Sequence, residues 1–145
     1  MIDTYLNYLQ ESELIQYLYH GSHIQGLKIL SPKFNTSRPM NHKGNYVYAA
    51  ENKKIASGFT FSWTDADGIK YGGMNDILEI QIPKRLIKLI KKPCSLYKVD
   101  SSSFIKANTG FKEYISKKDV KVLDEEKYRS AEECMKKNGL KIKII

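Results

Sequence analysis

Three short segments carry side chains that could act together on one nucleotide-like ligand. Residues 19–22 read Tyr-His-Gly-Ser, residues 45–50 form a second aromatic-rich segment, and residues 113–116 begin with a lone carboxylate. Glycine leaves the backbone open to a flat ligand, and the neighbouring His20 can hydrogen-bond the same ligand. An aromatic ring could stack on that ligand. We therefore expect a histidine, a tyrosine and Glu113 to converge on one site.

Each of these residues also has an ordinary structural explanation. A histidine such as His20, at the end of a strand, is often satisfied within a turn or the core. A glutamate beside a lysine, as in Glu113, is more often a solvated charge. Tyr46 and Tyr48 are both good strand formers, so packing explains at least one of them. The occurrence of all three segments in order is what favours a shared site.

The composition predicts one basic domain spanning residues 1–145, a length that is enough for its own core. The sequence contains no run of 18 apolar residues, so no membrane-spanning helix is predicted. The first residues also lack the pattern of a secretory signal, and we expect no membrane association. Two isolated cysteines, Cys94 and Cys134, favour a cytoplasmic protein without a metal site. The formal net charge of +8 favours an anionic partner, either nucleic acid or an acidic protein.

Apolar periodicity predicts strands separated by short helices. Helices are expected at residues 3–14, 51–57 and 84–92, and a last helix is expected from a cap at Asp124 to about Asn138. Strands are expected at residues 16–22, 45–50, 77–82, 95–99, once or twice within 113–122, and at 141–145. Because regular βαβ alternation is missing, the sequence predicts an α+β fold with a mainly antiparallel sheet.

Some segments allow more than one interpretation. Residues 59–63 alternate aromatic and polar side chains, as in a half-buried strand or an extended segment. Residues 31–45 and 64–75 are expected to be loops. Asp65 and Asp67 are spaced like the start of a calcium loop, but the twelfth position lacks the usual glutamate, so no calcium site is expected.

The predicted helix at residues 84–92 is strongly basic. Lys88, Lys91 and Lys92 recur at spacings of three and four residues, so they would share one face of an α-helix. Such a face is usually only solvated. The alternative is a docking patch for an anionic target.

Taken in order, the three segments resemble the motifs of the ADP-ribosyltransferase superfamily. The match is to its branch that uses a His, Tyr, Glu set, which includes diphtheria toxin and the poly(ADP-ribose) polymerases. Residues 19–22 are similar to the first motif, residues 47–50 followed by Ala56 to the second, and residues 113–116 to the third. The spacing to Ala56 favours Tyr48 over Tyr46 as the stacking residue without settling the choice. The resemblance spans residues 17–122.

The resemblance implies a split antiparallel β-sheet core with short flanking helices and a cleft that binds NAD as co-substrate without a metal. It implies that His20 hydrogen-bonds a ribose hydroxyl, that the Gly21 backbone holds the nicotinamide amide, and that Tyr48 stacks on the nicotinamide ring. Glu113 would hold the ribose 2′-hydroxyl next to the reacting carbon. The remaining NAD contacts are expected from Ser22, Tyr46 and Phe59.

Two classes of function follow from this resemblance. The first is an NAD-dependent ADP-ribosyltransferase that cleaves the nicotinamide–ribose bond and transfers ADP-ribose to a protein or nucleic-acid acceptor. The second is an inactive module of the same type that binds NAD, ADP-ribose or nucleic acid. RNA 2′-phosphotransfer ranks third, because the three arginines, which phosphate binding would favour, are scattered along the chain.

Overall fold

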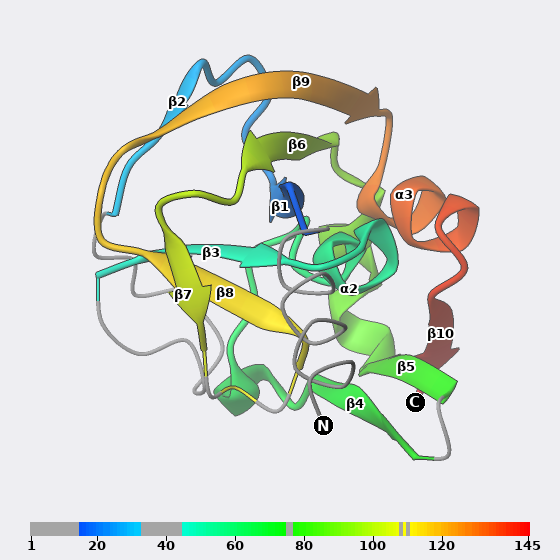
Figure 1. The fold of residues 1–145 in the computed structure, drawn as a ribbon. Helices are drawn as coiled ribbons and strands as arrows, with labels where there is room; N and C mark the ends of the chain where they lie inside the picture. Colours follow the sequence, from blue (N-terminus) through cyan, green and yellow to red (C-terminus); the bar gives the residue numbers. More distant parts are fainter. Residues whose placement is uncertain (1–14, 33–44, 75–76, 108, 110) are drawn as a thin grey trace, which may run out of the picture.

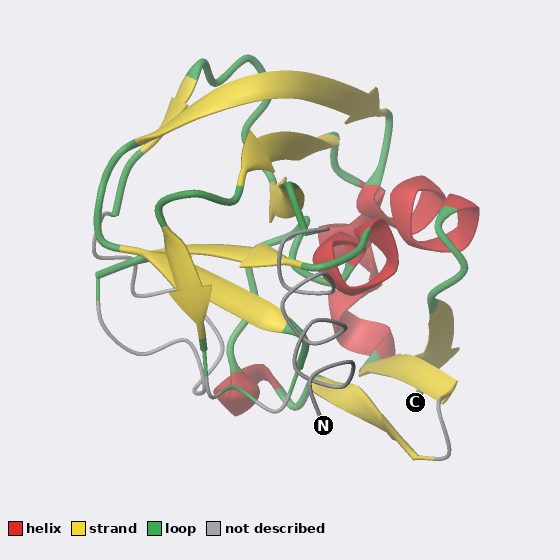
Figure 2. Ribbon diagram, viewed as in Figure 1, coloured by secondary structure: helices red, strands yellow, loops and turns green. Residues whose placement is uncertain are grey.

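Two β-sheets form most of the described structure, and its two α-helices lie together on one side of it (Figures 1 and 2). The computed structural model describes residues 15–32, 45–74, 77–107, 109 and 111–145. The predicted helix at residues 3–14 and most of the predicted loop at residues 31–45 lie outside these ranges. Within them, the predicted α+β class with mainly antiparallel sheets is confirmed.

The larger sheet contains seven strands in the order β2-β9-β6-β1-β3-β8-β7. All six of its strand pairs are antiparallel. In Figure 1 the long strand β9 arches over β6, and β3 and β8 cross below them. The strands are β1 Tyr17–Ser22, β2 Ile29–Leu30, β3 Val47–Ala50, β6 Cys94–Asp100, β7 Phe104–Lys106, β8 Glu113–Ser116 and β9 Val120–Tyr128.

The smaller sheet has the order β10-β5-β4. The strands β4 (Lys70–Met74) and β5 (Ile77–Ile82) pair antiparallel, whereas β10 (Lys141–Ile144) runs parallel to β5. The strand predicted at residues 77–82 is confirmed. Its Ile80 and Ile82 side chains are fully buried, as the alternating pattern requires.

The larger sheet is opened between β1 and β3. The strand β1 pairs with β6 at six positions, from Tyr17 to Ser22. On its other edge, β1 pairs with β3 only at Tyr19, which lies opposite Ala50. Beyond this one pair the two strands diverge, so side chains from both can line the same space.

Two short α-helices begin at polar caps that accept a backbone hydrogen bond. In α2 (Lys53–Ser57), the Asn52 side chain accepts from the backbone N–H of Ile55 at 2.9 Å. In α3 (Ala131–Lys137), the Ser130 hydroxyl accepts from the backbone N–H of Glu133 at 3.0 Å. The prediction that Asp124 caps the last helix is wrong. Asp124 lies within β9, opposite Lys98 of β6.

The basic segment is helical, but it is a 3₁₀-helix, η2, spanning Lys84–Lys91. A 3₁₀-helix has about three residues per turn, so side chains three apart lie in one column. Lys88 and Lys91 therefore share a column, whereas Lys92 follows the end of the helix. The prediction that three lysines share one α-helical face is wrong. Lys91 is also held in an ion pair with Glu132 at 2.6 Å.

Two predicted segments differ in the structure. Residues 59–63 do not form a strand, because turns follow α2 directly. The Thr60 hydroxyl donates to the Ser57 carbonyl at 2.6 Å, and the Trp63 indole donates to the Gly58 carbonyl at 2.9 Å. Residues 64–75 are not only a loop. They contain the short 3₁₀-helix η1 (Asp65–Asp67) and the strand β4.

Apolar side chains form two core clusters. One cluster lies where α2 and α3 meet both sheets, and it includes Ala56, Ile80 and Met135. The other cluster is built from the larger sheet and includes Leu18, Ala49 and Tyr97. The longest helix in the described ranges has eight residues, which is too short to cross a membrane.

Candidate active site

A cleft of about 330 Å³ lies at the place where β1 and β3 diverge. This cleft is lined by every site residue that was predicted from the sequence. They come from β1, β3, the segment after α2, and the start of β8. These residues are His20, Gly21, Ser22, Tyr46, Tyr48, Phe59 and Glu113.

The strand order places the three principal residues on adjacent strands. His20 lies on β1, Tyr48 on β3 and Glu113 at the first position of β8. The strand β3 lies between the other two and pairs with both, so Ala50 is opposite Tyr19 on one side and opposite Glu113 on the other. Residues separated by more than 90 positions in sequence are therefore neighbours across one β-strand.

The imidazole of His20 is fixed by the strand across the opening. Its Nδ1 atom lies 2.6 Å from the carbonyl oxygen of Tyr48. A carbonyl oxygen can only accept, so this contact places the proton on Nδ1. In the neutral ring the other nitrogen, Nε2, is then an acceptor for a donor such as a sugar hydroxyl.

Gly21 is required by packing as well as by the cleft. A Cβ atom at this position would lie 2.2 Å from the carbonyl oxygen of Ala56 in α2. The missing side chain therefore lets α2 approach β1 closely. Ser22 ends β1, and its hydroxyl accepts from the backbone N–H of Ile24 at 3.1 Å, which begins the turn after the strand.

Three of the predicted site residues contribute aromatic rings to the walls of the cleft. The rings of Tyr46 and Tyr48 meet edge to face, with centroids 6.1 Å apart. Phe59 stands nearly parallel to Trp63, with centroids 6.1 Å apart and planes inclined by 10°. Phe59 therefore belongs to an aromatic cluster and presents only part of its surface to the cleft.

Glu113 is a buried carboxylate, only 1% exposed. The hydroxyl of Thr109 donates to its Oε1 atom at 2.8 Å, and its own backbone carbonyl accepts from the N–H of Ala107 at 2.9 Å. Both contacts come from the segment just before β8, and the one from Thr109 holds the carboxylate itself. A buried acid that is hydrogen-bonded in this way differs from the solvated surface charge considered for Glu113.

The aromatic cluster behind Phe59 extends to Tyr71 and Phe111, whose ring centroids are 4.8 Å apart. The Tyr71 hydroxyl donates to the carbonyl of Ile55 at 2.7 Å. Burial, followed by the negative charge of Glu113, raises the pKa of the Tyr71 phenol well above its usual value. Tyr71 therefore stays neutral near the carboxylate and links β4 to the segment that carries Glu113.

Another wall of the cleft comes from residues 23–31, which the sequence did not indicate as a site. His23, Ile24 and Leu27 line the cleft from the turn after β1. Tyr97 of β6 anchors this turn, because its hydroxyl accepts from the N–H of Leu27 at 3.1 Å and donates to the carbonyl of Ile24. These contacts depend on the pairing of β1 with β6, which no local motif reveals.

Within the described ranges, no group of three or more His, Cys, Asp or Glu side chains is placed to hold a metal ion. The cleft combines an oriented imidazole, aromatic walls and a buried carboxylate, which together can bind a sugar and stabilise positive charge on it.

No protein-family model, curated protein or solved structure matches the chain.

Proposed function

We propose that this protein is an NAD-dependent ADP-ribosyltransferase. The observation that carries the proposal is the arrangement of His20, Tyr48 and Glu113 on three adjacent strands around one cleft. The same three residues are those that the resemblance of the three sequence motifs selects.

His20 and Tyr48 bind the ribose and the nicotinamide in this proposal. The Nδ1 contact to the Tyr48 carbonyl holds the imidazole so that Nε2 accepts from a ribose hydroxyl. The Tyr48 ring packs on the nicotinamide, which is cationic until its bond to ribose breaks, so a cation–π contact favours the bound form. Since the same tyrosine holds the histidine through its backbone, the two contacts are positioned together.

Glu113 stabilises the reacting carbon of the ribose. The bond from this carbon to the nicotinamide nitrogen breaks, and the neutral nicotinamide leaves with the electron pair. The ribose then carries positive charge like that in glycoside cleavage, and a nearby carboxylate stabilises it. The acceptor forms the new bond to the same carbon and loses a proton. Thr109 orients the carboxylate through its 2.8 Å hydrogen bond.

Nicotinamide release from NAD by the purified full chain tests the proposal. We expect time-dependent release, measured by chromatography, together with NAD binding, measured by titration calorimetry. Binding without release would support the second interpretation, a non-catalytic module that keeps the cleft. Neither binding nor release at millimolar NAD would overturn the enzymatic interpretation, and it would also overturn the non-catalytic interpretation as far as NAD is its ligand.

A further inference from the structure

The edge of the larger sheet next to Glu113 is strongly basic. Between residues 101 and 118 the sequence has four lysines and one acid, Glu113, which is buried. We call this region, formed by β7, β8 and the turn after β8, the β7–β8 edge. None of its lysines takes part in the ion pairs found among the described residues. These lysines are Lys106, Lys112, Lys117 and Lys118.

A row of apolar side chains runs from the cleft to this edge. Tyr48 of β3 lies opposite Ile115 of β8, and Ile115 lies opposite Ile105 of β7. Side chains at paired positions point to the same face of a sheet, and Glu113 shares this face because it lies two residues before Ile115. Ile105 is 61% exposed. The row therefore connects the proposed reaction centre to open surface.

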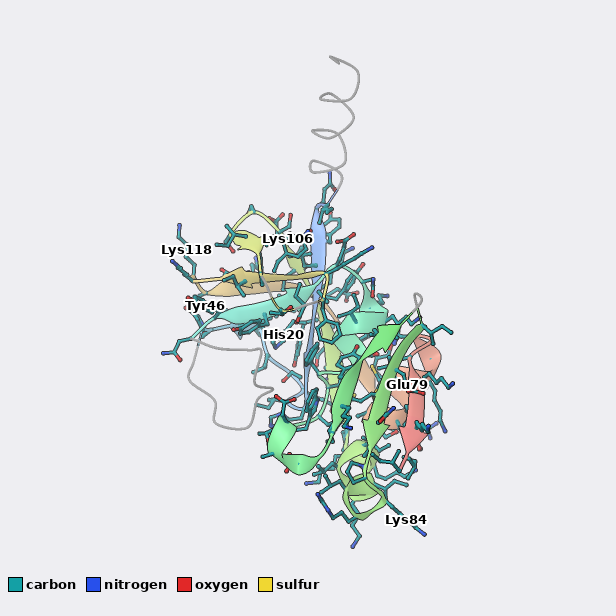
Figure 3. All side chains as sticks on the ribbon, turned by 90° about the horizontal axis from the view of Figure 1, so that it is seen from below. His20, Tyr46, Glu79, Lys84, Lys106 and Lys118 are labelled. Atoms are coloured by element: carbon teal, nitrogen blue, oxygen red, sulfur yellow. The ribbon has the colours of Figure 1, made fainter. Side chains whose placement is uncertain are left out.

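Aromatic rings and lysines also meet at one end of the β3–β8 pair. Figure 3 shows Tyr46 and Lys118 at this end, with His20 nearer the middle of the molecule. Val47 lies opposite Ser116 in this antiparallel pair. The residue before Val47 is Tyr46 and the residue after Ser116 is Lys117, so these two residues are neighbours at this end. Cationic side chains beside half-exposed aromatic rings are typical of surfaces that bind single-stranded nucleic acid, because they contact phosphates and stack on bases.

We propose that the β7–β8 edge binds the phosphate backbone of a single-stranded nucleic acid and that an unstacked base of this strand accepts ADP-ribose. This inference rests on the proposed function. Glu113 lines the cleft and is only 1% exposed, so a base has to leave a duplex in order to approach it. A base nitrogen forms the bond to the ribose carbon as nicotinamide leaves, and the proton of that nitrogen passes to Glu113 and then to water.

The test of binding uses fluorescence anisotropy with a labelled 20-nucleotide single-stranded DNA of mixed sequence and the full chain, without NAD. The edge variant replaces Lys106, Lys117 and Lys118 with glutamate. We expect its affinity to fall at least tenfold. The slope of log affinity against log salt should decrease by about 2, since roughly 0.7 is expected for each lost phosphate contact to a single strand.

A matched control variant replaces Lys84, Lys88 and Lys92 with glutamate. These lysines are exposed, lie on or beside η2, and produce the same change in net charge. We expect the control to bind within about threefold of the wild type. Equal losses in the two variants would overturn the proposal in favour of general charge attraction. Equal competition by a polyglutamate peptide or by duplex DNA would overturn it in favour of another anionic partner. Thermal unfolding curves confirm that both variants fold.

The acceptor is tested by intact mass of the same oligonucleotide after incubation with the wild-type chain and NAD. We expect a mass increase of one ADP-ribose group. Nicotinamide release without a mass change on the oligonucleotide would overturn the acceptor assignment and leave the proposed function intact. Oligonucleotide binding at the edge without any nicotinamide release would support the binding surface. It would overturn the proposed enzymatic function, and the acceptor assignment would be overturned with it.

Discussion

The imidazole Nδ1 of His20 lies 2.6 Å from the backbone carbonyl oxygen of Tyr48, on the strand across the opening of the sheet. The two strands pair at only one position, so this side-chain contact joins them where backbone pairing has ended. It places the proton on Nδ1, so that in the neutral ring Nε2 is the acceptor. The opening of the sheet and the orientation of the histidine are consequently parts of the same arrangement.

Replacing Tyr48 with alanine should weaken NAD binding about tenfold, or about 1.4 kcal/mol, through loss of the aromatic contact with the nicotinamide. The same change at Tyr46 should cost less than threefold, because Tyr46 precedes β3 and lies further from Glu113 along the same face. Titration calorimetry of both variants measures this difference. A larger loss for Tyr46→Ala would identify Tyr46 as the stacking residue.

Gly21→Ala should destabilise the protein. The new Cβ atom would lie 2.2 Å from the Ala56 carbonyl oxygen, so α2 must move away from β1. Overpacking of this kind costs about 1–3 kcal/mol. Gly72→Ala is the control, because no atom lies within 4 Å of a Cβ placed there. Urea unfolding curves compare the two, and a Gly21→Ala variant as stable as Gly72→Ala would show that the glycine is not needed for packing.

The strands with a clear apolar alternation were predictable from sequence, and the strand at Ile77–Ile82 is the best case. The part of β9 after Val122 was not, because its Asp124, Glu125 and Glu126 are poor strand formers. Their place in the sheet comes from partners far along the chain. The Glu125 carboxylate, for example, accepts from the Ser95 hydroxyl of β6 at 2.6 Å. Tertiary contacts therefore override local preference in this segment.

The strand β4 was missed for a related reason. Gly72 and Gly73 are typical of a loop, yet Gly73 pairs with Leu78 in a tight hairpin. A Cβ atom at Gly73 would lie 2.2 Å from the carbonyl oxygen of Ile77, so close backbone approach explains the glycine. A single sequence does not distinguish such a glycine from one that serves a flexible turn.

The three principal residues of the candidate site could be selected from the sequence, but the contacts that support them could not. The order of the motifs selected His20, Tyr48 and Glu113, and the structure places all three around the cleft. No local pattern indicates Thr109, which donates to Glu113, or Tyr97, which anchors the wall after β1. Such supporting contacts depend on the complete strand order rather than on local spacing.

The free energy of unfolding should fall at high pH partly because of Tyr71. Burial and the charge of Glu113 raise its pKa in the folded state above the ordinary value of 10.0. The unfolded chain therefore loses this proton above about pH 10 while the folded chain keeps it, and stability is lost as the pH rises from there. Tyr71→Phe removes the hydrogen bond to Ile55, so its free energy of unfolding at neutral pH should be about 1 kcal/mol lower than that of the wild type. Between pH 9 and 11, however, the free energy of unfolding of this variant should decrease less than that of the wild type.

Urea unfolding at several pH values measures the Tyr71 effect. Tyr17→Phe is the matched control for removal of a tyrosine hydroxyl, because the Tyr17 side chain is 42% exposed. Identical slopes for wild type and Tyr71→Phe above pH 10 would show that the Tyr71 phenol does not contribute to alkaline unfolding.

Glu113→Gln should reduce nicotinamide release by a hundredfold or more while leaving NAD affinity and thermal stability nearly unchanged. Glutamine keeps the shape of the side chain, and its amide oxygen can still accept from Thr109. It lacks the negative charge that stabilises the oxocarbenium-like ribose, an electrostatic contribution on the order of 3 kcal/mol. Glu51→Gln is the control, because Glu51 is a nearby acid that follows β3. Its carboxylate accepts a hydrogen bond from the Tyr114 hydroxyl at 3.5 Å. Wild-type turnover in Glu113→Gln, or an equal loss in Glu51→Gln, would contradict the role of Glu113 as the carboxylate at the reacting carbon.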